Sequence, residues 1–263
     1  MQAITTKELT FSYQGKTILE NISFSVKRGE TWAVIGRNGA GKSTLLKCLC
    51  GLLKPSSGNV FIDGNSVSKL KTRDIAKSTA YVPQGSGRLA PPFTVREYVL
   101  MARFPYRIFG SLPDENDKKR VDEALILTGT GHLSERIMGT LSAGEFQAAL
   151  LAGAVAQDTP FLLLDEPTTY LDPCHQENVR LVIERIHACR HTAVITVTHD
   201  INFALSCHNN VLSLIDGKTG FCGSKESFCD HAAEHLSKVF SVKFGSAALS
   251  EDKILYFTRG VGL

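Results

Sequence analysis

The sequence has little net charge and no long hydrophobic run. Its 263 residues include 29 Lys and Arg against 26 Asp and Glu, a formal net charge of +3, which is too even for non-specific nucleic-acid binding through a strongly basic face. The densest apolar run, residues 148–156, is far shorter than the ~20 residues that span a bilayer. We therefore expect a buried helix there, and a globular chain with no nucleic-acid partner.

Cysteines in metal-binding spacing are also missing. The sequence has an odd number of cysteines, so they cannot all pair within one chain, and they do not form the paired C-x-x-C blocks of a zinc site. Free thiols in a reducing compartment are the expectation. The first residues have no apolar stretch followed by a small-residue cleavage site, so no signal peptide is expected. The seven cysteines are Cys48, Cys50, Cys174, Cys189, Cys207, Cys222 and Cys229.

Strand-like and helix-like segments alternate along most of the chain, which predicts an α/β fold. Residues 2–12 and 17–27 alternate apolar and polar side chains, as in a partly exposed antiparallel sheet. Further strands are expected at 32–35, 60–62, 79–82, 161–164 and 193–197, with a last strand pair at about 210–222. Helices are expected at 42–53, 94–103, 116–128, 143–157 and 174–189.

Strand signals vanish between about residues 85 and 157, which predicts an inserted helical subdomain within one domain, 1–263. The core is then expected at about 1–84 and 158–240, with a mainly parallel sheet and an N-terminal antiparallel β subdomain. Residues 241–263 are expected to form a C-terminal tail.

A glycine-rich loop is the strongest motif. Residues 36–43 read GRNGAGKS, which matches the phosphate-binding pattern G-x-x-x-x-G-K-[ST]. Glycines let the backbone N–H groups of the loop and of the following helix wrap around an anion. The lysine reaches the β- and γ-phosphates, and the serine hydroxyl suits Mg²⁺. The candidate ATP-binding residues are Gly36, Arg37, Asn38, Gly39, Ala40, Gly41, Lys42, Ser43 and Thr44.

Two acidic residues follow an apolar strand. Residues 161–166 read FLLLDE, and the carboxyl end of a parallel strand is where open α/β sheets bind ligands. Asp165 suits a Mg²⁺ ion, usually through water. Glu166 suits polarisation of the attacking water as a general base.

The segment 141–145, with the sequence LSAGE, resembles the L-S-G-G-[QE] signature of ATP-binding cassette (ABC) ATPases. The resemblance implies that Ser142, Ala143, Gly144 and Glu145 face the ATP held by a partner subunit. The same residues also fit a capping box, with Ser142 as N-cap and Glu145 as the third helical residue. Both interpretations can hold together.

The resemblance covers roughly residues 1–240 and assigns four more residues. Tyr13 resembles the aromatic residue that stacks on adenine, although a lone strand tyrosine is more often a packing residue. Gln84 is similar to the Q-loop glutamine, which touches Mg²⁺ or the attacking water. Asp172 resembles the D-loop aspartate, and His199 resembles the switch histidine that contacts the γ-phosphate.

What the resemblance implies is an ATPase that works as a homodimer around two MgATP. Its catalytic residues are then Glu166, His199, Lys42 and Gln84, and Mg²⁺ is held by Ser43, Gln84 and Asp165. The family also implies two membrane-spanning permease subunits, an extracytoplasmic solute-binding protein acting indirectly, and a peripheral place at the cytoplasmic face of the cell membrane.

Four strings narrow the kind of cassette. Residues 93–97 (FTVRE) and 102–106 (ARFPY) resemble strings of importer ATPases for iron–siderophore, haem and cobalamin, and residues 165–172 and 197–202 are similar to that group. The alternatives are an importer ATPase for another solute, a soluble ABC ATPase uncoupled from transport, and a catalytically weak cassette that acts as an ATP-gated interaction module.

Two departures from the family pattern affect the expected rate. Ala143 stands where the signature has its first glycine, and its methyl group adds bulk where backbone approaches closely. The helix after the signature carries Phe146, Ala148 and Gly153 where the family usually has arginines. We therefore expect a working but slow ATPase.

Overall fold

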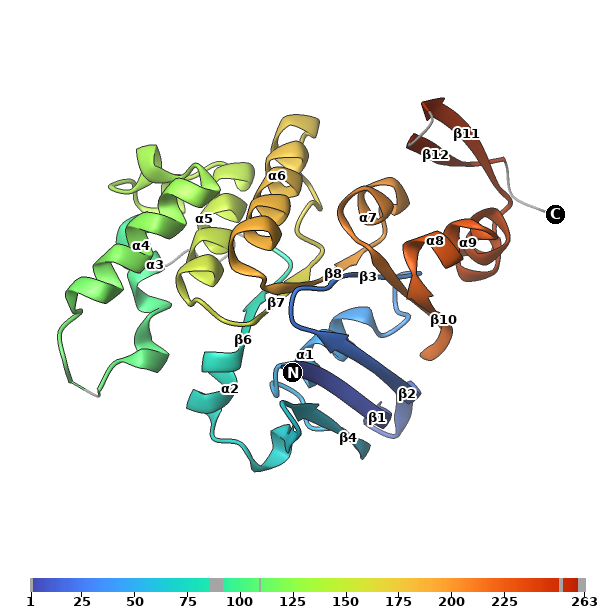
Figure 1. The fold of residues 1–263 in the computed structure, drawn as a ribbon, viewed down its shortest axis with the longest axis horizontal. Coiled ribbons are helices and arrows are strands. Elements are labelled where there is room, and N and C mark those ends of the chain that lie inside the picture. The colour runs from blue at the N-terminus through green and yellow to red at the C-terminus, as the bar shows by residue number, and fades with distance from the viewer. Residues whose placement is uncertain (1, 86–91, 109, 251–252, 260–263) are drawn as a thin grey trace. The chain divides into compact units, whose positions relative to one another are not determined.

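The computed structural model describes residues 2–85, 92–108, 110–250 and 253–259. They form two compact units, residues 1–68 with 195–263 and residues 69–194. The expected helical subdomain includes 86–91 and 109, and the expected tail includes 251–252 and 260–263, which lie outside the described residues. The expected division into core and helical subdomain stays a prediction. Figure 1 shows the elements.

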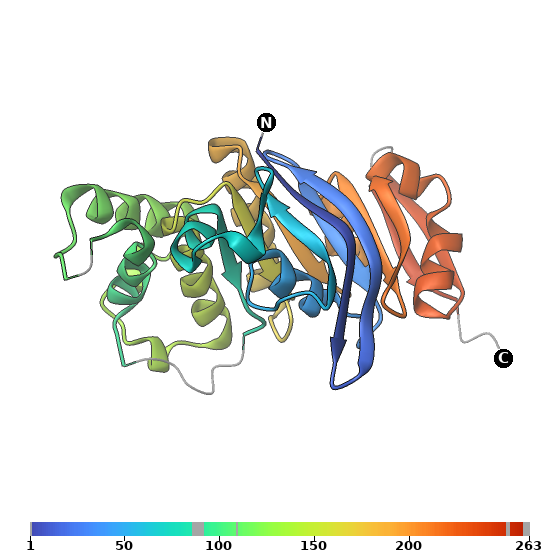
Figure 2. The same cartoon turned by 90° about the horizontal axis from the view of Figure 1, so that it is seen from below.

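The first unit contains an antiparallel sheet with the order β2-β1-β4-β5. Tyr13 pairs with Lys16 across a two-residue turn, in which Gln14 and Gly15 have φ angles of 49° and 83°. Two positive φ angles are the condition for the tight turn that matches strand twist. The long strands β1 and β2 run side by side (Figure 2), as the alternating pattern predicts. The strands are β1 (Ala3–Tyr13), β2 (Lys16–Lys27), β4 (Ser57–Ile62) and β5 (Asn65–Ser66).

A second set of strands in this unit carries the phosphate loop. Strand β3 (Thr31–Gly36) is buried along its whole length and pairs in parallel with β9 (Asn210–Ile215). Strand β10 (Lys218–Ser224) lies antiparallel to β9. Strand β8 (Ala193–Thr198) carries the chain from the second unit into the first. The expected strands at 32–35, 193–197 and 210–222 are thereby confirmed.

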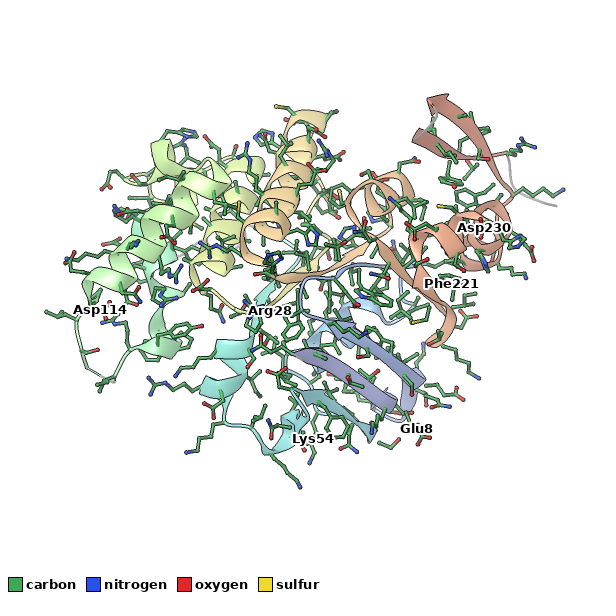
Figure 3. All side chains as sticks on the ribbon, viewed as in Figure 1. Glu8, Arg28, Lys54, Asp114, Phe221 and Asp230 are labelled. Carbon is green, nitrogen blue, oxygen red and sulfur yellow. The ribbon has the colours of Figure 1, made fainter. Side chains whose placement is uncertain are left out.

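The C-terminal segment packs on these strands through an apolar cluster. Phe228, Leu236 and Tyr256 are buried against β3, β9 and α7. The Phe221 ring, labelled in Figure 3, lies 5.2 Å from that of Phe228 in an edge-on arrangement. The elements are α7 (Ile201–Cys207), α8 (Lys225–Cys229), α9 (Ala232–Phe240), β11 (Phe244–Ser250) and β12 (Lys253–Thr258).

One expected helix is shorter than its apolar spacing predicts. Helix α1 runs over Lys42–Leu49, so the expected end at residue 53 is wrong. Gly51 has a φ of 71°, a conformation that ends helices. Leu52 is 62% exposed. Leu52 therefore has helical spacing in the sequence but does not pack in the core.

The second unit contains most of the helices. Strands β6 (Thr79–Val82) and β7 (Phe161–Asp165) pair in parallel. Capping boxes open three helices, and Asp114, at the start of α4, is labelled in Figure 3. Within the described residues, no helix is long and apolar enough to cross a membrane. The helices are α2 (Thr72–Ser78), α3 (Val95–Met101), α4 (Glu115–Thr128), α5 (Ala143–Ala156) and α6 (Pro173–Arg190).

A buried ion pair joins three helical segments of this unit. Arg103 Nε lies 3.1 Å from Asp117 Oδ1, and the two side chains are 3% and 4% exposed. Arg103 Nη1 also donates to the Ala156 carbonyl oxygen over 2.9 Å, and its guanidinium lies over the Tyr106 ring. The importer-like string at 102–106 therefore has a packing role in this unit.

Candidate functional site

The glycine-rich loop follows β3 and opens α1. Gly39 and Gly41 have φ angles of 85° and 93°, which side chains with a Cβ rarely adopt. Lys42 is only 5% exposed. Its Nζ donates to the carbonyl oxygens of Gly36 and Arg37 over 2.8 and 3.0 Å. The ammonium group is therefore held against the loop.

The start of α1 fits an anion. Its N-cap is Gly41, with no capping hydrogen bond from a side chain in the described residues. Ser43 and Thr44 occupy the first turn, where backbone N–H groups have no intrahelical acceptor. Such N–H groups, together with a nearby lysine, bind phosphate.

Two further candidates lie in the first unit. Tyr13 ends β1 with its side chain 63% exposed, so its ring face is available for stacking. His199 directly follows β8 and is exposed. The next residue, Asp200, caps α7 by accepting from Phe203 N. The structure thus places the loop, Tyr13 and His199 in one unit.

The acidic pair lies in the second unit, at the end of β7. Asp165 is 3% exposed, and its Oδ2 accepts from the Tyr81 hydroxyl over 2.9 Å. Tyr81 lies on β6, which pairs with β7. The sequence reasoning missed Tyr81, because the sequence does not show that its strand lies beside the strand of the acidic pair.

Hydrogen bonds from Gln84 and Thr169 hold the Glu166 side chain. Its φ of 48° lies in the left-handed region, directly before Pro167. Its Oε2 accepts from Gln84 Nε2 over 3.1 Å and from Thr169 Oγ1 over 2.9 Å. The structure thereby brings Gln84 and Glu166 together. Thr169 was missed, because its contact depends on the turn after the strand.

The signature segment forms the expected capping box. Ser142 Oγ accepts from Glu145 N over 3.3 Å, and Glu145 Oε2 accepts from Ser142 N over 2.8 Å. These bonds, together with the nearby Arg136, hold the pKa of the Glu145 carboxyl below its ordinary value. Ala143 is exposed in the first turn of α5, and Gly144 is buried.

Asp172 opens the helix that follows the acidic pair. Its side chain is the N-cap of α6 and accepts from His175 N over 2.9 Å. Hydrogen bonds from His175 hold the pKa of Asp172 below its ordinary value, so the carboxylate is charged at neutral pH. Asp172, Ser142, Gln84 and Glu166 all belong to the second unit.

These features define a nucleotide-binding cassette: a phosphate loop between a buried strand and a helix, an acidic pair ending a second strand, and a capped signature helix. The protein-family model described as ABC transporter matches residues 19–169. The chain belongs to the ABC transporter family. Its activity is that of an ABC ATPase, which binds and hydrolyses ATP.

Relatives in this family cover most of the chain. The petrobactin import ATP-binding protein FpuD of Bacillus anthracis is 36% identical over 229 residues, which cover 87% of this chain and 84% of FpuD. The hemin import ATP-binding protein HmuV of Gloeobacter violaceus is 42% identical over 211 residues, which cover 78% of this chain and 75% of HmuV.

Two solved structures share the fold over most of their length. A metal-chelate type ABC transporter in an inward-facing conformation is 27% identical with a TM-score of 0.82, covering 97% of this chain and 96% of its own. The ATP-binding cassette MJ0796, a post-hydrolysis dimer bound to ADP and Pi, is 28% identical with a TM-score of 0.75, covering 84% of this chain and 98% of its own. The predicted fold class, a P-loop ABC ATPase with an antiparallel β subdomain and helices, is confirmed.

Proposed function

We propose that this chain is the ATPase subunit of an importer for a metal chelate such as an iron–siderophore, haem or cobalamin. The observation that carries the proposal is the intact set of Lys42, Asp165 and Glu166 in a cassette whose relatives import petrobactin and hemin. The strings at 93–97 and 102–106 support an importer over a soluble cassette.

ATP is held in this proposal by residues from two subunits. Lys42 and the loop N–H groups bind the phosphates, and the exposed ring of Tyr13 stacks on adenine. Ser142 and its neighbours approach the ATP of the partner subunit, so two ATP molecules join two subunits. The dimer of the related cassette MJ0796 supports this arrangement.

The residues present fit a magnesium ion. Mg²⁺ takes hard oxygen ligands, and the Ser43 hydroxyl, the Asp165 carboxylate and the Gln84 amide supply them. The bond from Tyr81 described above holds the Asp165 carboxylate through its Oδ2 atom. When bound, Mg²⁺ neutralises charge on the β- and γ-phosphates.

Hydrolysis depends on the residues around Glu166. Its carboxylate positions and polarises the attacking water as general base, and Gln84 and Thr169 fix its orientation. Lys42 and His199 stabilise the charge on the phosphoryl group. Loss of the γ-phosphate removes contacts made only in the closed dimer, which then opens.

The partners follow from the importer proposal. Two permease subunits bind the ATPase dimer at the cytoplasmic face of the membrane, and a solute-binding protein outside delivers the chelate. Opening and closing of the dimer then drives alternating access in the permease.

Uptake in the native host tests the proposal. Deletion of the gene is expected to abolish uptake of one of three labelled chelates: ferric siderophore, haem or cobalamin. Expression of the wild-type protein is expected to restore that uptake. The Glu166→Gln variant, expressed at the same level, is not expected to do so. Unchanged uptake of all three chelates in the deletion strain contradicts the metal-chelate proposal.

Replacement of Tyr81 by phenylalanine tests the bond to Asp165. A hydrogen bond to a charged group contributes roughly 1.5–3 kcal/mol, so we expect kcat to fall about 10-fold and the half-saturating Mg²⁺ concentration to rise. A magnesium titration of ATPase activity measures both. Tyr98→Phe, a tyrosine packed against Gly153 of α5, is the matched control. Equal magnesium midpoints in Tyr81→Phe and wild type contradict the assigned role.

Ala143→Gly tests the departure in the signature. The Ala143 methyl group is exposed at the start of α5, on the segment proposed to approach the partner's ATP. Removing it is expected to raise the basal ATPase rate about two- to tenfold, since a crowded contact costs up to roughly 1–3 kcal/mol. A rate equal to or below that of wild type counts against the crowding argument.

A further inference from the structure

His175 contacts two segments of the candidate site within the second unit. It is the third residue of α6, and its ring Nδ1 lies 2.9 Å from Asp172 Oδ1, which also accepts from His175 N. Because the Asp172 carboxylate only accepts, Nδ1 carries the proton of this bond. The ring is therefore fixed in orientation by the residue that caps its own helix.

The other side of the ring fills the space next to Gly144. A Cβ built on Gly144 would lie 2.0 Å from His175 Cδ2 and 2.3 Å from Cγ, far inside van der Waals contact. Gly144 is buried at the start of α5. The His175 ring of the same subunit therefore leaves no room for a side chain at Gly144, the second signature glycine. This requirement for glycine does not depend on contact with the nucleotide.

The Asp172 side chain is more exposed than the ring that contacts it. The His175 side chain is 34% exposed and that of Asp172 is 59% exposed. Among the described residues, the Asp172 side chain is held by backbone N–H groups at the start of α6 and by the His175 ring. Glu145, which lines a cavity together with Gly144 and His175, forms an ion pair with Arg136 over 2.8 Å. The Asp172–His175 bond is thus separate from the Glu145–Arg136 pair.

We propose that His175 is a positioning residue. Its ring fixes Asp172, which follows the acidic pair in the sequence, relative to the start of the signature helix α5. The inference rests on the proposed function, in which the Ser142 segment contacts ATP held by the partner subunit. With the ring in place, the signature segment and Asp172 are presented to the partner in one fixed arrangement. His175 itself touches no nucleotide.

ATP-driven dimerisation measures this positioning role. In the Glu166→Gln background, His175→Ala is expected to raise the ATP concentration for half-maximal dimerisation by at least about 5-fold, the lower range of coupling between sites. Binding of a fluorescent ATP analogue to the monomer is expected to stay unchanged. His175→Asn, whose amide can donate to Asp172, recovers at least half of the loss. An unchanged midpoint in His175→Ala overturns the proposal.

His187→Ala is the matched control. It removes a histidine from the same helix, α6, further from its start. The dimerisation midpoint of this variant is expected to equal that of the Glu166→Gln parent. A shift as large as that of His175→Ala means that any damage to α6 weakens dimerisation, which overturns the positioning role.

A thermal cycle without nucleotide tests the ring contact separately. Gly144→Ala is expected to lower Tm by a few degrees in the wild-type background, because overpacking is destabilising. In the His175→Ala background the drop is expected to shrink by at least half, whereas additive drops overturn the proposal. If ATP fails to dimerise the Glu166→Gln parent, the proposed function fails, and this cycle still decides whether the ring requires Gly144.

Discussion

Glu166→Gln is expected to lower the kcat for ATP hydrolysis by at least about 100-fold, the lower end of what a positioned general base contributes. Glutamine keeps the size of the side chain and can still contact Gln84 and Thr169, which donate to Glu166 Oε2 in the wild-type protein. It cannot accept a proton from water. ATP binding is expected to persist, so dimers accumulate when ATP is added.

Steady-state phosphate release and size-exclusion chromatography with ATP measure these two effects. Glu20→Gln, an exposed glutamate on β2 paired with Lys218, is the matched control and is expected to hydrolyse ATP like wild type. A Glu166→Gln enzyme with more than about a tenth of the wild-type kcat would mean that another group acts as the base.

Arg103→Ala is expected to lower the free energy of unfolding by about 3–5 kcal/mol, because it leaves Asp117 buried without its partner. The pair is almost fully buried, and the same guanidinium bonds to the end of α5. Denaturant unfolding monitored by circular dichroism measures the loss. Because Arg103 lies in the importer-like string at 102–106, the variant also shows whether that string stabilises the packing of the unit.

Arg96→Ala is the matched control for the buried pair. Arg96 forms an ion pair with Asp122 in which the side chains are 43% and 52% exposed, and exposed pairs contribute about 0–1 kcal/mol. If Arg103→Ala loses no more stability than Arg96→Ala, the buried pair does not hold the helical segments together.

The phosphate loop, the acidic pair and the signature could be predicted from the sequence because each is a local pattern. In the loop, the glycines and the lysine lie within eight consecutive residues, 36–43. The capping box joins residues three apart. The same holds for the N-terminal strands, where alternation records which face is buried. Local patterns of this kind predicted the bounds of α4, α5 and α6 to within one residue.

Contacts across elements could not be predicted in the same way. Tyr81 reaches Asp165 from the neighbouring strand, and the His175 ring packs on a glycine of another helix. A single sequence does not record such pairs. The end of α1 was wrong for a related reason, since apolar residues at helical spacing do not show that a core lies beneath them.

Affinity capture from detergent-solubilised native membranes, with tagged Glu166→Gln protein and ATP, tests whether this chain is the ATPase subunit of a transporter. We expect a polytopic membrane protein to copurify in equal amount with the ATPase. A dimer of this chain recovered without any membrane partner would contradict the importer function and favour a soluble ABC ATPase.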